Sequence, residues 1–214
     1  MHLKKKILKI IAMLTLLISN DSFELYEKLE KDNDISIKFE DLPNEFTLQS
    51  YDTVVDFIQK TKNLEFECLM YFNYVTGKIL KFEIGTSNNV KIDFNKEFDD
   101  HHVASIHNHP KSVYSPPSGK NFGILMREFE DYELIVGDSG LWILKAKGIN
   151  FNLNLDLKYS ALMILDSCQE YSIKRYPPSK ANDICDVMYG TMLSNYINDK
   201  NLKDIQLTKK EYQL

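Results

Sequence analysis

Short runs rich in apolar and aromatic residues occupy the middle of the chain and predict β-strands. The runs 65–74 and 78–84 flank Thr76-Gly77, a pattern typical of a β-hairpin. The runs 132–136 and 141–146 flank Asp138-Ser139-Gly140 and predict a second hairpin. A compact apolar segment at 102–107 and a shorter one at 90–94 are further strand candidates.

Segments with a helical pattern lie before, between and after these runs. The expected helices cover 22–30 and 51–60, a segment that begins at Ser118, and then 157–176 and 181–196. We therefore predict an α+β fold with a mostly antiparallel sheet flanked by helices. Its expected parts are an N-terminal helical extension (1–63), a core (64–148) and a C-terminal helical extension (149–214). Residues 200–214 are charged and show no clear pattern.

Composition narrows the class of protein. Of the 214 residues, 43% are hydrophobic and 27% charged, as in an ordinary soluble globular protein. The net charge of −5 argues against a nucleic-acid partner, which usually requires a basic face. Cys68, Cys168 and Cys185 are odd in number and widely spaced, so we expect free thiols in a reducing compartment and no disulfide framework.

The N-terminal segment raises the question of a membrane or secretion signal. Three lysines at 4–6 precede a mainly apolar run, but its uncharged part, 10–18, is too short to cross a bilayer. Lys9 interrupts the run, and no small-residue cleavage pattern follows it. We expect a helix that packs on the domain, a cytoplasmic protein and no membrane partner, with a signal or anchor as the alternative.

Histidine is the most informative residue type, because four of the five fall within nine positions. On a strand, His107 and His109 project from the same face with backbones about 7 Å apart, which suits two imidazoles that bind one ion. Zinc would need at least one more protein ligand, and an open position if the site is catalytic. Pro110 would end the strand, and His101 and His102 are expected to face solvent or to pack in a loop.

A hydrolytic zinc site needs two further groups. The first is a carboxylate that takes a proton from the attacking water and delivers it to the leaving amine. Glu65 and Glu67 share one face of the first predicted strand and are the candidates. The second is a donor to the developing oxyanion, for which the Ser118 hydroxyl is the candidate.

The string His107-Asn108-His109-Pro110, followed by a loop and Ser118-x-x-Asn121, resembles the signature of JAB/MPN (JAMM) domain metallo-isopeptidases, in the prokaryotic form. The resemblance covers roughly residues 64–148. It implies a cytidine-deaminase-like fold and zinc held by His107, His109 and the position of Asn121. It also implies Ser118 as the oxyanion helper and Glu67 as the acid/base, with Glu65 as the alternative.

Asn121 departs from that family, which has aspartate at this position. An amide oxygen carries no charge and binds zinc more weakly than a carboxylate. The site could work with weaker affinity, recruit Asp99 or Asp100, or bind no metal. The sequence therefore supports two functions: a zinc-dependent peptidase or isopeptidase acting on a protein or protein-modifier substrate, or a non-catalytic JAB/MPN-like binding module. An HNH nuclease is not expected, because its motif residues are widely separated. The pattern does not predict an oligomeric state.

Overall fold

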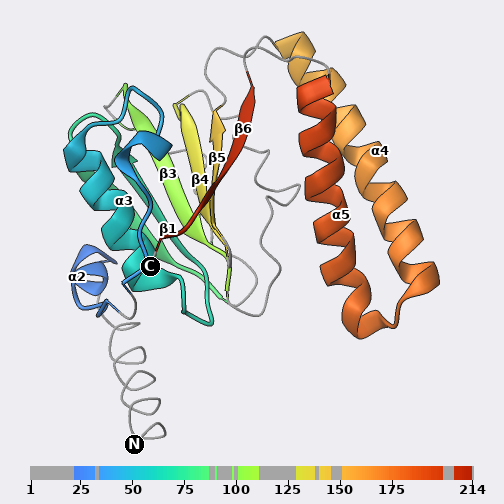
Figure 1. Ribbon diagram of the computed structural model, residues 1–214, viewed down its shortest axis with the longest axis horizontal. Coiled ribbons are helices and arrows are strands. Elements are labelled where there is room, and N and C mark those ends of the chain that lie inside the picture. Colours follow the sequence, from blue (N-terminus) through green and yellow to red (C-terminus); the bar gives the residue numbers. More distant parts are fainter. Residues whose placement is uncertain are drawn as a thin grey trace, which may run out of the picture.

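The computed structural model describes residues 22–31, 34–86, 90, 98, 101–110, 129–137, 140–145, 151–199 and 205–213. Helices α2, η1 and α3 come first, followed by five strands, two long helices and a final strand (Figure 1). Their bounds are α2 Ser22–Glu27, η1 Phe39–Asp41, α3 Leu48–Thr61, β1 Cys68–Asn73, β2 Ile79–Ile84, β3 Val103–Asn108, β4 Tyr132–Val136, β5 Gly140–Lys145, α4 Phe151–Arg175, α5 Pro178–Asp199 and β6 Gln206–Glu211.

The strands form one mixed sheet in the order β2-β1-β3-β4-β5-β6. All neighbouring pairs are antiparallel except β3 and β4, which run parallel. The predicted α+β class, the mostly antiparallel sheet and both hairpins are confirmed. The parallel pair brings the C-terminal ends of β3 and β4 together at one edge, and β3 has a partner on each side.

Gly77 fixes the first hairpin turn and its packing against α3. Its φ is +71°, in the left-handed region that favours glycine. A Cβ at this position would also lie 2.6 Å from the Gln49 carbonyl oxygen, near the start of α3. Thr47 caps that helix by accepting a hydrogen bond from the Ser50 amide. The hairpin and the helix are therefore joined at their ends.

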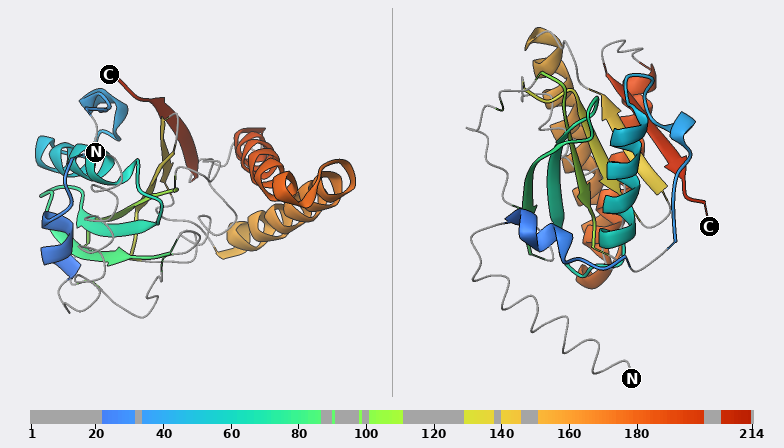
Figure 2. Two further views of the ribbon diagram at one scale, coloured as in Figure 1. Left: turned by 90° about the horizontal axis from the view of Figure 1, so that it is seen from below. Right: turned by 90° about the vertical axis from the view of Figure 1, so that its left-hand side faces the viewer.

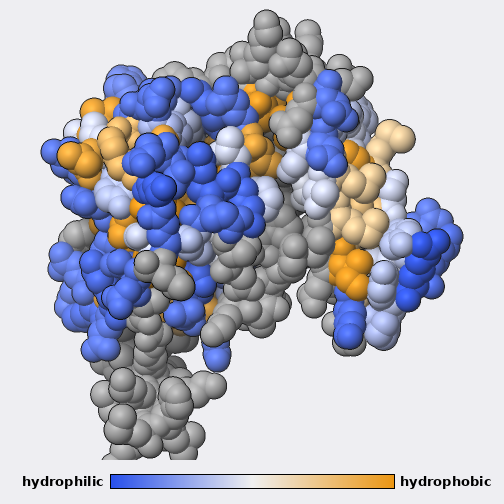
Figure 3. Space-filling view, in the orientation of Figure 1, coloured by the Kyte–Doolittle hydropathy of each residue, from blue (hydrophilic) through white to orange (hydrophobic). Residues whose placement is uncertain are grey.

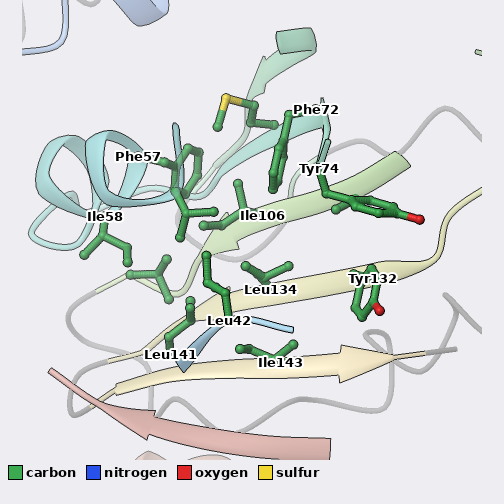
Figure 4. Close-up of a cluster of buried hydrophobic side chains, with 14 of the residues drawn as sticks. Leu42, Phe57, Ile58, Phe72, Tyr74, Ile106, Tyr132, Leu134, Leu141 and Ile143 are labelled. Atoms are coloured by element: carbon green, nitrogen blue, oxygen red, sulfur yellow. The ribbon is translucent and has the colours of Figure 1, made fainter. Parts of the chain in front are cut away.

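Helix α3 covers one face of the sheet and encloses the main core. Its buried positions recur at helical spacing, at residues 50, 54, 57, 58 and 61. Figure 4 shows part of this core, in which side chains from α3 and from strands β1, β3, β4 and β5 meet. The labelled members are Leu42, Phe57, Ile58, Phe72, Tyr74, Ile106, Tyr132, Leu134, Leu141 and Ile143.

The N-terminal part contributes directly to this core. Tyr26, Ile37, Leu42 and Phe46 are buried in the same cluster as the strand residues. Figure 3 shows that the outer surface over this region is mainly hydrophilic. The helices predicted at 22–30 and 51–60 correspond to α2 and α3.

The C-terminal part is not purely helical, which corrects the sequence-based expectation. Helices α4 and α5 are present and form a hairpin beside the β6 edge of the sheet (Figure 2). The chain then returns as β6, which pairs with β5 along six residues. Leu193 and Ile197 of α5 share a buried cluster with Leu144 of β5, so the hairpin is attached to the sheet by apolar contact.

Two further expectations concern the thiols and the membrane. All three cysteines are free and buried, as predicted. Among the helices that the structure describes, none is both long and apolar enough to span a membrane.

Candidate metal centre

The two histidines lie at the C-terminal end of β3, in the middle of the sheet. His107 is 4% exposed and His109 is 9% exposed. The His109 amide donates to the Val136 carbonyl at 3.0 Å, so pairing with β4 continues one residue past β3. Pro110 follows and, because it has no backbone N–H, ends this pairing. Both imidazoles thus project from a braced backbone on the face of the sheet opposite to α3.

The rings converge through one nitrogen each. The Nε2 atoms of His107 and His109 are 3.2 Å apart, and the ring centroids are 5.1 Å apart. Two nitrogen ligands at 2.0–2.1 Å in a tetrahedral zinc site lie roughly 3.3–3.4 Å apart. The observed separation therefore fits two imidazoles that share one zinc ion, and it also fits an N–H···N hydrogen bond between the rings.

Burial keeps His109 in the form that can bind a metal. Removal from water lowers the pKa of His109 to about 4, because the charged imidazolium is disfavoured there. The ring is therefore neutral at physiological pH, with a lone pair available on one nitrogen. Its Nδ1 is buried and has no hydrogen-bond partner in the described part of the chain. The two imidazoles, with His109 neutral, therefore fit two of the protein ligands that a zinc ion needs.

The structure separates the two candidate carboxylates. Glu65 is exposed and lies in a bend before β1, outside the strand predicted for it. Glu67 is half-buried and pairs through its backbone with Thr86 and Gly85, which extends the β1–β2 ladder by one step. β1 and β3 are antiparallel with Leu69 opposite His107. This is the last pair of the ladder, since the Cys68 amide donates to the Asn108 side chain. Strand alternation places Glu67 on the same face of the sheet as Leu69, which is the histidine face.

The Asn108 side chain lies on the face of the sheet opposite to the histidines and has a structural role. Its Oδ1 accepts from the Cys68 amide at 2.6 Å, and its Nδ2 donates to the carbonyls of Phe66 and Thr61 at 2.9 and 3.2 Å. These bonds fasten the end of β3 to the segment that leads from α3 into β1 and carries Glu67. Strand alternation places Asn108 on the face opposite the histidines, a signal that the sequence already contained.

Two buried carboxylates near the histidines were missed by the sequence analysis. Glu133 of β4 is 2% exposed, and one of its oxygens lies 3.5 Å from Nδ1 of His107. Glu130 is equally buried and accepts a hydrogen bond from the Ser105 hydroxyl. The available signal was a lone acidic residue inside an apolar strand, since Glu133 interrupts Tyr132–Val136.

Several predicted site residues lie outside the described residues, namely Ser118, Asn121, Asp99 and Asp100. The helix expected from Ser118 and most of the segment 90–94 fall there too. Within the described residues, no group of three or more His, Cys, Asp or Glu side chains is arranged to hold a metal. His101 and His102 are exposed, as expected.

A surface hollow of about 360 Å³ lies elsewhere, between the η1 region and strands β5 and β6. Its walls carry two ion pairs, Lys145 with Glu45 at 2.8 Å and Lys210 with Asp41 at 3.5 Å. Tyr132, which also lines it, belongs to the core on the α3 side of the sheet. The hollow is therefore separate from the histidine pair.

Comparisons with known protein families, with curated proteins and with solved structures give no match to this chain.

Proposed function

We propose that this chain is a zinc-dependent hydrolase of the JAB/MPN type that cleaves an amide bond in a protein or peptide substrate. The observation that carries the proposal is the convergence of the two Nε2 atoms, 3.2 Å apart, on the face of the sheet where strand alternation also places Glu67. The sequence resemblance supplies the family, and the geometry of the histidines supports it.

In this proposal His107 and His109 hold the metal, and Asn121 stands at the position of the third ligand. Bound zinc would lower the pKa of a water molecule to near 7 and polarise the substrate carbonyl. Glu67 would accept a proton from the attacking water and pass it to the leaving amine, for which its half-buried position on the histidine face is suited. Ser118 donates to the developing oxyanion.

The structure gives a reason to prefer Glu67 over Glu65 as the acid/base. A proton carrier must lie within hydrogen-bond reach of the water that it activates, directly or through one more water. Glu67 is held by backbone pairing on the histidine face, whereas Glu65 is exposed in a bend. Glu65 is therefore the matched control for a substitution at Glu67.

The test compares wild type, Glu67→Gln and Glu65→Gln for bound zinc and for hydrolysis of a library of internally quenched peptides. We expect all three proteins to bind zinc. Only Glu67→Gln should lose turnover, by about 10²–10⁴-fold, the usual contribution of a general acid/base. Full activity of Glu67→Gln would contradict the assigned role, and a wild type that binds no zinc would contradict the hydrolase.

The second candidate function is a non-catalytic JAB/MPN-like binding module, and the uncharged Asn121 favours it. In that case wild type would bind no zinc and cleave no peptide. Asn121→Asp then adds information, because zinc binding gained by this variant would place the histidines and residue 121 around one site.

A further inference from the structure

A buried carboxylate on β4 contacts the ring nitrogen of His107 that faces away from His109. Glu133 is 2% exposed and is flanked along its strand by buried Tyr132 and Leu134. Burial of a charged group costs free energy unless the group is paired or hydrogen-bonded. The structure therefore requires a partner for Glu133, and His107 is one that it provides.

The two nitrogens of His107 are directed to different neighbours. Nδ1 lies 3.5 Å from Oε1 of Glu133, and Nε2 lies 3.2 Å from Nε2 of His109. β3 and β4 are parallel, and Ser105 is paired with Glu133. His107, two residues after Ser105, therefore lies on the same face of the sheet as Glu133, on the adjacent strand. An approach of about 0.5 Å would bring Nδ1 and the carboxylate within ordinary hydrogen-bond distance.

We propose that Glu133 is a positioning residue, which accepts the Nδ1 proton of His107 and thereby directs the Nε2 lone pair at the metal. This inference rests on the proposed zinc site. A metal-bound imidazole commonly donates its other N–H to a carboxylate, which fixes the tautomer and ring orientation and makes the ligand more basic. His109 lacks such support among the described atoms, since its Nδ1 has no hydrogen-bond partner there. The two ligands are thus supported unequally, and the affinity of the site depends on Glu133.

Glu130 provides a matched control for Glu133. It is also 2% exposed, and its carboxylate accepts a hydrogen bond from Ser105, on the same strand as His107. Substitution at Glu130 therefore removes a buried carboxylate from the same neighbourhood without removing the contact to His107. A merely structural role of Glu133 would give the two positions similar effects on the metal site.

The experiment measures zinc affinity of the full chain by competition with a chromophoric chelator, for wild type, Glu133→Met, Glu133→Gln and Glu130→Gln. Loss of a carboxylate that orients a ligating histidine costs about 10–100-fold in metal affinity. We expect that loss in Glu133→Met. A smaller loss is expected in Glu133→Gln, whose amide oxygen still accepts the Nδ1 proton, and a change within about threefold in Glu130→Gln. Circular dichroism checks that each variant folds.

A second readout is the tautomer of His107 in the metal-free protein, observed by ¹⁵N NMR of the imidazole. We expect Nδ1-protonated His107 in wild type and in Glu133→Gln, and loss of that preference in Glu133→Met. The inference is overturned if wild type binds zinc but Glu133→Met binds it equally well, or if Glu130→Gln loses as much affinity. Wild type that binds no zinc overturns the proposed function instead, and the inference with it.

Discussion

Replacement of Asn108 by alanine tests how the histidine strand is held in place. The variant removes the side-chain amide, which makes three hydrogen bonds. Its oxygen accepts from the Cys68 amide, and its nitrogen donates to the carbonyls of Phe66 and Thr61. Asn108, Cys68 and Thr61 are all fully buried, so water does not replace these partners. Phe66, whose carbonyl accepts the third of these bonds, is only half-buried.

The expected loss follows from those three bonds. A buried polar group that loses its partner costs about 1–3 kcal/mol. The Cys68 amide is stranded in this way, whereas the Thr61 carbonyl still accepts from the Leu64 amide at 3.0 Å and the Phe66 carbonyl can turn to solvent. We therefore expect Asn108→Ala to lower the free energy of unfolding by about 2–4 kcal/mol, most of it from the Cys68 amide. Because Asn108 also fastens the segment that carries Glu67, turnover should fall further than zinc binding does.

Urea denaturation followed by far-UV circular dichroism measures this loss, with an unchanged denaturant slope as the check on two-state behaviour. Asn44→Ala is the matched control: Asn44 is exposed in a turn, and its loss should stay within about 0.5 kcal/mol. Asn108→Asp keeps the acceptor for Cys68 but presents an oxygen to two carbonyls, so it should be nearly as unstable as Asn108→Ala. If Asn108→Ala matched the Asn44→Ala control, the structural role of Asn108 would be refuted.

Three further predictions address the turn, the protonation of the site and the third ligand. Gly77→Ala should destabilise the protein by about 2 kcal/mol or more in thermal unfolding, because φ is +71° and a Cβ would meet the Gln49 carbonyl at 2.6 Å; an unchanged midpoint would contradict that packing. In the metal-free protein, wild type should lose about 3 kcal/mol of stability relative to His109→Gln as the pH falls from 7 to 4. Burial lowers the folded-state pKa of His109 to about 4, so the unfolded chain takes up the proton first, near 6.5. Parallel curves of unfolding free energy against pH for the two proteins would disprove it. Asn121→Asp should bind zinc more tightly than wild type in a chelator competition, since a carboxylate is the stronger ligand, and a weaker affinity would argue against residue 121 as a ligand.

The local parts of the fold could be predicted from the sequence. Gly77 and the apolar runs beside it define the first hairpin, because the turn needs a positive φ and a strand buried on both faces is apolar throughout. The pairing of His107 with His109 follows from the same alternation, since residues two apart share a strand face. The opposite orientation of Asn108 follows from it as well.

The non-local parts could not be predicted in this way. β6 reads Gln-Leu-Thr-Lys-Lys-Glu and is largely exposed, so its charges resemble those of a solvated tail, although charged residues are common on sheet edges. The contact of Glu133 with His107 depends on the parallel pairing of β3 with β4, which are separated by more than twenty residues. Glu67 likewise shares a sheet face with the histidines only through the pairing of β1 with β3.

The most direct test of the paired-histidine site is a measurement of bound zinc after equilibrium dialysis of the full chain, followed by metal analysis. His109→Gln removes one of the two converging nitrogens, and His101→Gln is the matched control, because His101 is exposed and lies outside the pair. We expect about one zinc per chain in wild type and in His101→Gln, and a loss of most of it in His109→Gln. Equal zinc in wild type and His109→Gln, or none in wild type, would contradict the claim that these two imidazoles share a metal ion.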